Sequence, residues 1–291
     1  MAMRRYGKGD LCGITAQTES AYGTANEDKT HMGVMTGLKI DPGITTEEQP
    51  ECGSRLMGTQ YMVGRDCTAK VDLKISKEAE WLEWFKWALG TDGTGNISGL
   101  QNTPTGRTVL FKVAPQSYDR LAGAYINDLT ITSDKIGAPL KFSATIYAKE
   151  YQENIDAEGE PLAGGTPLRS TQGWSCNNSG IGTINAGEWT LTITQNLEKV
   201  PGADADEITN ESGQEPYMGS PEITLEITTP ARTRSIDTLR NTLTTGLIFT
   251  TQIGGHAITV SGGVLESEGT QRARDPYNET ITVKAANITI V

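Results

Sequence analysis

Side chains able to activate a nucleophile are scarce in this 291-residue chain, which has two histidines. His31 lies in the N-terminal segment, and His256 follows a pair of glycines. A Ser/His/Asp or Cys/His site would need one of them as its base, yet neither has neighbours of the required types. The sequence also contains no GxSxG, P-loop or HExxH motif. We therefore expect that the protein is not an enzyme.

Residues able to bind metals do not follow the spacing of known metal sites. Asp204, Asp206 and Glu207 form an acidic group whose oxygens suit Ca²⁺. The group lacks the glycine and the distant glutamate of a calcium-binding loop, so a solvated acidic loop is favoured. The cysteines show no CxxC pair and are expected to be reduced thiols: Cys12, Cys52, Cys67 and Cys176. We expect no metal and no cofactor.

Two further segments have a functional and a structural interpretation. Trp81, Trp84 and Trp87 suit a platform on which sugars or bases stack, but they also suit the packing of a helix on a sheet, which is commoner. The glycines of residues 91–96 suit an anion, but they follow a predicted helix instead of preceding one. We expect core packing in the first case and an ordinary turn in the second.

Composition excludes several classes of protein. Lys and Arg number 25 against 36 Asp and Glu, which gives a net charge of −11. Proteins that hold nucleic acid by neutralising phosphates carry clustered Lys and Arg, so tight binding of DNA is not expected. No apolar run approaches the ~18 residues needed to cross a bilayer, and no apolar segment follows the basic residues at the start. We expect neither a membrane span nor a secretion signal.

Alternation of apolar and polar residues dominates the chain and predicts strands with one buried face. Such runs cover residues 38–40, 70–75, 129–132, 140–149, 191–194, 222–227, 258–260 and 281–284. The 39 Thr suit the half-wet surface of these strands, and the 33 Gly suit the turns between them. The predicted fold class is mainly β, with antiparallel sheets.

Two segments predict helices. In residues 77–90, Trp81, Trp84 and Phe85 recur at helical spacing, between a Ser that can cap the helix and a Gly that can end it. We expect these three aromatic residues to pack the helix against a sheet. A weaker pattern covers residues 231–243, which are rich in Thr.

One order of elements occurs in both halves of the chain, which predicts a tandem duplication. Each copy would be an antiparallel β-sandwich or partial barrel with a flanking helix. The predicted boundaries are an N-terminal arm at residues 1–30, a first domain at 31–153, a linker at 154–186 and a second domain at 187–291. Loops at residues 41–66 and 197–220 exceed the length of simple hairpins at the same place in each copy, which favours a function for both.

This layout resembles the tail tube protein, or major tail protein, of long-tailed bacteriophages. The resemblance covers nearly the whole chain but rests on diffuse motifs. They are Tyr22-Gly23-Thr24 in the arm, Tyr61-Met62-Val63-Gly64 at the end of the long loop, residues 71–75 running into the helix, and residues 125–132 turning into residues 140–147.

The resemblance implies a structural role in the virion. Tail tube proteins are β-sandwiches whose inner sheets join between subunits into a continuous barrel, and their rings stack through arms and long loops. A doubled chain resembles members in which three subunits form a pseudo-hexameric ring. The implied neighbours are the tape measure, tail terminator and baseplate or tail-tip proteins, and DNA passes through the tube without tight binding. Assembly in the host cytoplasm and location in the virion tail follow from the same resemblance.

Residues in the arm and the long loops are the predicted contacts between subunits and between rings. They are Tyr22, Pro42, Glu47, Glu48, Arg55, Met57, Tyr61, Glu207 and Tyr217. Deleting residues 42–58 is therefore predicted to leave a folded subunit that stacks poorly. The net negative charge is predicted to keep passing DNA from adhering to the channel.

A second class of protein shares many of these features. Exported surface modules, such as adhesins, pilin-like subunits and carbohydrate-binding domains, also have Thr-rich and Gly-rich strands with exposed aromatic residues. They normally require export, and the sequence predicts no secretion signal. Stacked rings seen by electron microscopy would favour the tube, whereas monomers that bind glycans would favour the surface module.

Overall fold

A computed structural model describes most of the chain. The described residues are 13–21, 23–26, 30–49, 59–65, 67–75, 78–90, 97–98, 105–114, 117–156, 168–170, 172–177, 183–184, 188–198, 216–230, 246–271 and 278–291. In these ranges the protein consists mainly of antiparallel strands with one α-helix, which confirms the predicted mainly-β class. The predicted helix at residues 231–243 lies outside the described residues.

The elements follow one another in two series. The first comprises Gly13–Thr18 (β1), His31–Asp41 (β2), Ile44–Gln49 (β3), Thr59–Arg65 (β4), Cys67–Lys74 (β5), the helix Glu78–Leu89 (α1), Ile97–Ser98 (β6), Arg107–Ala114 (β7), Ser117–Ser133 (β8), Lys141–Ala148 (β9) and Glu150–Asp156 (β10). The second comprises Trp174–Cys176 (β11), Thr183–Ile184 (β12), Glu188–Thr194 (β13), Leu197–Glu198 (β14), Tyr217–Met218 (β15), Glu222–Pro230 (β16), Leu247–Ile253 (β17), His256–Gln271 (β18), Asn278–Ala285 (β19) and Asn287–Ile290 (β20).

Six strands of the first series pair in a closed circuit. Its order is β8-β7-β1-β2-β5-β9 and back to β8, and every pairing is antiparallel. The circuit closes because β8 is long enough to pair with two strands in succession. Its first part pairs with β7, and its second part, from Tyr125 onward, pairs with β9.

The second series pairs in the same order. β11, β17, β18, β19, β16 and β13 follow one another as neighbours, and β11 also pairs with β12, which precedes β13 along the chain. Each pairing has a counterpart in the first circuit, with β12 and β13 together in the place of β2. The hairpins β3–β4 and β14–β15 also occupy equivalent places in the two series.

The long strands β8 and β18 share their irregularities as well. Gly123 and Gly262 both have a positive φ, 61° and 70°, a conformation that glycine adopts without steric cost. Four residues after each glycine comes a bulge, at Asn127 and at Glu266, where the pairing with β9 or β19 skips one residue. This shared order of pairing and of irregularities is what a tandem duplication requires, and the duplication itself stays a prediction.

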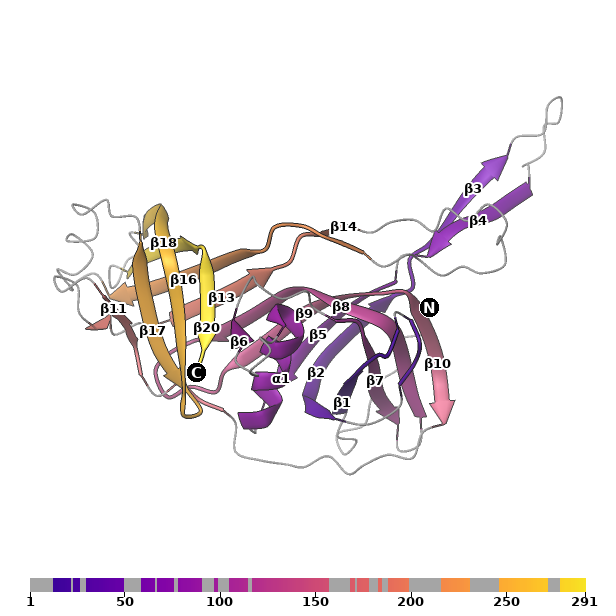
Figure 1. Ribbon diagram of the computed structural model, residues 1–291, viewed down its shortest axis with the longest axis horizontal. Coiled ribbons are helices and arrows are strands. Elements are labelled where there is room, and N and C mark those ends of the chain that lie inside the picture. The colour runs from indigo at the N-terminus through magenta and orange to yellow at the C-terminus, as the bar shows by residue number, and fades with distance from the viewer. Residues whose placement is uncertain are drawn as a thin grey trace.

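The two series meet edge to edge along β8 and β13, where residues 128–133 pair with residues 189–194. One sheet therefore runs β2-β5-β9-β8-β13-β16-β19-β18 across the whole molecule. Figure 1 shows this sheet passing from the barrel that holds β1, β2 and β7 to the body that holds β16, β17 and β18. Apolar residues line one face of the sheet as a continuous core.

Three strands lie within the segments predicted as the N-terminal arm and the linker. β1 lies inside the predicted arm, yet it pairs with β2 and β7 and buries Ile14 and Ala16. β11 and β12 lie inside the predicted linker, yet they pair with each other and β11 also pairs with β17. These strands are two to six residues long, so their alternation is too short to stand out from the surrounding polar residues.

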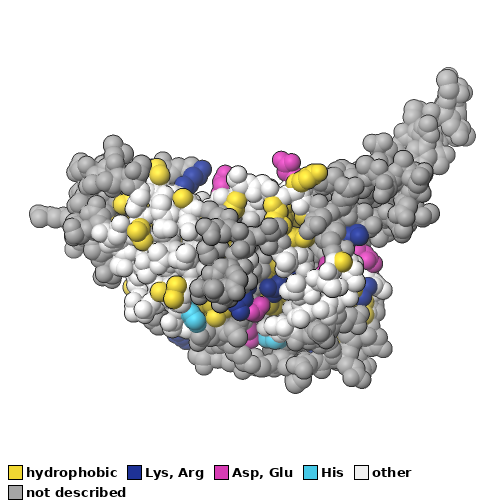
Figure 2. Space-filling view, viewed as in Figure 1, with side chains coloured by type: hydrophobic (Ala, Val, Ile, Leu, Met, Phe, Trp, Pro, Cys, Tyr) yellow, Lys and Arg dark blue, Asp and Glu magenta, His cyan; other side chains and the backbone are white. Residues whose placement is uncertain are grey.

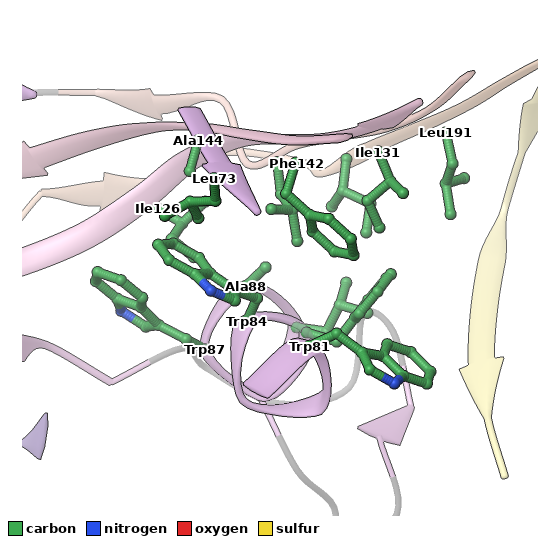
Figure 3. Close-up of a cluster of buried hydrophobic side chains, with 14 of the residues drawn as sticks. Leu73, Trp81, Trp84, Trp87, Ala88, Ile126, Ile131, Phe142, Ala144 and Leu191 are labelled. Carbon is green, nitrogen blue, oxygen red and sulfur yellow. The ribbon is translucent and has the colours of Figure 1, made fainter. Parts of the chain in front are cut away.

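The helix α1 lies within the predicted range and ends at Gly90, whose φ is 77° and whose N–H donates to the Lys86 carbonyl over 2.9 Å. Trp81, Trp84 and Phe85 are fully buried. In Figure 3 the Trp84 ring lies between the helix and the sheet residues, whereas the Trp81 and Trp87 rings lie on either side of the helix. This burial makes them core residues and leaves no exposed ring on which a sugar or base could stack.

Candidate assembly surfaces

The join between the two series is formed by residues 128–133 of β8 and 189–194 of β13. One face of it is buried in the core, called here the dry face, and the other carries polar residues, called here the wet face. Leu129 and Ile131 lie opposite Ile193 and Leu191 on the dry face, and all four are at most 1% exposed. On the wet face the residues are mostly Thr, and the hydroxyl oxygens of Thr132 and Thr190 lie 3.4 Å apart. Such cross-strand pairs stabilise a sheet edge by roughly 0.2–1 kcal/mol each.

The bulge residue Asn127 fastens one end of the join. Its carbonyl accepts from the Gln195 N–H over 2.7 Å, and its side-chain oxygen accepts from the Leu197 N–H over 2.9 Å. Beside it, the Thr194 hydroxyl donates to Asp128 over 2.9 Å. The bulge thus directs Asn127 toward the segment that follows β13. The sequence around Asn127 does not reveal this role, because the bulge depends on pairing with distant strands.

The helix α1 contacts both series of strands. Trp84 donates its indole N–H to the Met32 carbonyl of β2 over 2.7 Å. The buried side chain of Gln195, just after β13, donates to the Ala88 carbonyl at the end of the helix. Farther along, β6 adds to the edge of β20, with Ile97 opposite Ile290. The segment after β5 therefore holds the second series against the first.

Both histidines lie against this helix. His31 Nδ1 is 2.8 Å from the Glu80 carboxylate, which is only 3% exposed. The His256 ring lies edge-on to Trp81, with 5.7 Å between the centroids. Contact with the core helix gives each histidine a packing role. Figure 2 shows histidine side chains and a small group of basic and acidic side chains on a described surface that is otherwise mostly uncharged.

Three ionisable side chains among the described residues have a shifted pKa: Arg107, Tyr118 and Tyr151. Burial lowers the pKa of Arg107, and the Glu83 carboxylate 3.4 Å away opposes that shift. Burial also raises the pKa of Tyr151, and the Asp119 carboxylate, which accepts from its hydroxyl over 3.2 Å, raises it further. Burial also raises the pKa of Tyr118, so all three shifts reflect the packing of these side chains.

The wet face of the long sheet carries both signs of charge. It bears five lysines and six carboxylates: Lys39, Lys70, Lys74, Lys141, Lys284, Asp41, Asp72, Asp128, Glu188, Glu222 and Glu226. Lys39 lies directly opposite Lys70, and Lys74 lies directly opposite Lys141. Four of the lysines lie in the first series, and three of the carboxylates lie in the second. Because five lysines nearly balance six carboxylates, this face contributes little to the net charge of −11.

The predicted contact residues are distributed over the loops. Glu47 lies opposite Tyr61 in the β3–β4 hairpin, and Glu198 lies opposite Tyr217 in the β14–β15 hairpin. Figure 1 shows β3 and β4 projecting away from the barrel. Pro42 lies between β2 and β3, Glu48 lies in β3, and the Tyr217 side chain is 68% exposed. Tyr22, Arg55, Met57 and Glu207 lie outside the described residues.

Among the residues that the structure describes, no three His, Cys, Asp or Glu side chains come together as a metal site would require. Cys67 and Cys176 are buried. The acidic group at residues 204–207 and the glycine-rich residues 91–96 fall outside the described ranges. Over those ranges, no helix has the length and apolar character needed to cross a membrane.

Comparison with protein-family models and with curated proteins finds no match to this chain.

Proposed function

We propose that the chain is a structural subunit that assembles with its own copies into rings, and that the rings stack into a phage tail tube. The observation that carries the proposal is the join between β8 and β13, where two series of strands with one order of pairing meet edge to edge. A chain that joins two such units by strand pairing has the means to join further units in the same way.

The proposal includes the tandem duplication. Two equivalent units in one chain mean that three chains supply six equivalent positions around a ring. The wet face of the sheet then lines the channel. Its mixture of lysines and carboxylates would neither hold a polyphosphate strongly nor repel it strongly, so DNA could pass. The described strands carry nearly balanced charge on that face, so we propose that this balance, together with the net negative charge of the chain, keeps DNA from adhering.

The projecting β3–β4 hairpin is proposed to reach the next ring. Its strands pair with each other and, within the described residues, with no other strand. A hairpin that contributes nothing to the sheet is free to contact a neighbour. The tape measure, terminator and tail-tip proteins are the further partners that this role requires.

Electron microscopy of the purified chain, combined with sedimentation velocity, tests the proposal. Rings or tubes with an open channel, whose amount rises with protein concentration, are the expected result. A single species with the mass of one chain at every concentration, without rings in the images, would contradict it.

A further inference from the structure

Two strand edges have no partner within the described part of the chain, and they lie at opposite ends of the long sheet. β2 pairs with β1 through residues 31–34 only, which leaves the same edge open over residues 38–41. β18 pairs with β17 up to Gly263, which leaves that edge open over residues 264–271. Within the described residues, the sheet of each copy therefore has one edge without a partner at either end.

The join inside the chain shows what these edges correspond to. β13 relates to β16 as β2 relates to β5, and matching these pairings through β9 and β19 places residues 38–41 where residues 189–192 stand. In the same way, the shared bulges of β8 and β18 place residues 269–271 where residues 130–132 stand. The two open edges are thus the equivalents of the two strands of the join.

We propose that residues 39–41 of one copy pair, antiparallel, with residues 269–271 of a second copy, in the register of the join. The inference rests on the proposed ring and specifies its seam. Lys39 then lies opposite Gln271, as Thr190 lies opposite Thr132 within the chain. Because the two edges are different surfaces, this contact is heterologous and closes into a ring when the rotation per copy allows it. The long sheet would continue from copy to copy.

The chemistry of the seam differs from that of the join in one respect. Thr270 stands where the buried Ile131 stands in the join, opposite Ile40. The seam therefore depends more on main-chain hydrogen bonds and less on apolar contact than the join does. Such a contact forms and separates with protein concentration, whereas the join is permanent. Pro42, which has no N–H to donate, ends the seam.

Disulfide cross-linking tests the register directly. In a variant with Cys12 and Cys52 replaced by Ser and Cys67 and Cys176 by Ala, the pair Lys39→Cys and Gln271→Cys is introduced and oxidised. Residues opposite each other in antiparallel strands have Cα atoms about 4.5–5.5 Å apart, which a disulfide spans. The matched control is Thr132→Cys with Thr190→Cys, the equivalent pair within one chain. The control for register is Lys39→Cys with Ser267→Cys, displaced by about 13 Å along the strand.

For the Lys39/Gln271 pair, the expected result is a ladder of disulfide-linked dimers and trimers on a non-reducing gel. The ladder should disappear when the protein is oxidised at a lower concentration. The Thr132/Thr190 control should link within the chain at every concentration, and the displaced pair should give little product. If particles are seen by microscopy but the Lys39/Gln271 pair cross-links no more than the displaced pair, the seam is overturned and the ring proposal stands. If the intrachain control links but no particle larger than one chain forms, the ring proposal fails and the seam fails with it.

Discussion

His31 and Glu80 fasten the start of β2 to the first turn of α1. Their contact is one of several in which polar side chains hold the helix on the sheet, along with Trp84 to Met32 and Gln195 to Ala88. At the residue scale, these polar and ionisable side chains therefore hold the helix against the sheet. This distribution agrees with a structural protein, in which polar groups fix the geometry of a subunit.

The tryptophans of α1 differ in their hydrogen bonds, which gives a matched pair of variants. Trp84→Phe removes a buried bond to Met32, whereas the Trp81 indole N–H has no hydrogen-bond partner within the described residues. Both substitutions remove similar buried area. We expect Trp84→Phe to lower the free energy of unfolding by about 1 kcal/mol more than Trp81→Phe, because an unpaired buried acceptor remains. Urea unfolding measures the difference, and equal losses would show that the bond contributes nothing.

The facing lysines of the wet face make a second prediction. Lys39 and Lys70 are directly opposite each other, and like charges in that position destabilise a sheet. Lys70→Glu should raise the free energy of unfolding of the isolated chain by about 0.5 kcal/mol, and added salt should reduce the gain. Thermal unfolding at low and high salt measures both effects. A loss of stability at low salt would contradict the interpretation.

At the scale of elements, the bend in β18 depends on Gly262. Its φ is 70°, and a Cβ built there lies 2.8 Å from the Cβ of Ala286. Gly137 has a φ of 83° with no atom within 4 Å of an added Cβ, so it isolates the cost of the backbone conformation. We expect Gly137→Ala to cost about 1 kcal/mol and Gly262→Ala about twice that or more. Similar losses for the two variants would show that the contact with Ala286 is not limiting.

The β3–β4 hairpin can be removed without opening the first circuit. Replacing residues 44–65 by a short Gly-Ser linker should leave the free energy of unfolding nearly unchanged, because the described strands of the hairpin pair only with each other. If the hairpin joins successive rings, the variant should form single rings instead of long tubes. Tube length in electron micrographs measures this, and tubes of normal length would refute the stacking role. Shortening the loop between β14 and β15 is the matched control in the second series.

The strands that the sequence predicts best are those with long alternation, such as β5, β9 and β16. The register between the two halves could not be predicted in the same way, because shifting a strand by two residues preserves its alternation. The alternating run at residues 38–40 does not decide which of its residues corresponds to Leu191, whereas the strand pairings place Ile40 at that position. The bulges and the join of β8 with β13 depend on contacts between distant segments, which a single sequence does not specify.

At the scale of the whole molecule, one sheet carries both the stability of the subunit and its open edges. Eight strands run from β2 to β18, with a dry face over the core and a wet face of Thr, Lys and carboxylates. An open edge is an aggregation hazard for a monomer. In the proposed ring, the two edges that lack a partner within the described residues become the joints between copies, so the feature that would harm a monomer would support assembly.

A cryo-electron microscopy reconstruction of the particles formed by the purified chain tests the central claim most directly. The account predicts a ring of three chains with six equivalent positions, in which the sheet is continuous from β18 of one copy to β2 of the next and its wet face lines the channel. A particle in which these edges face solvent or the wet face points outward would contradict it.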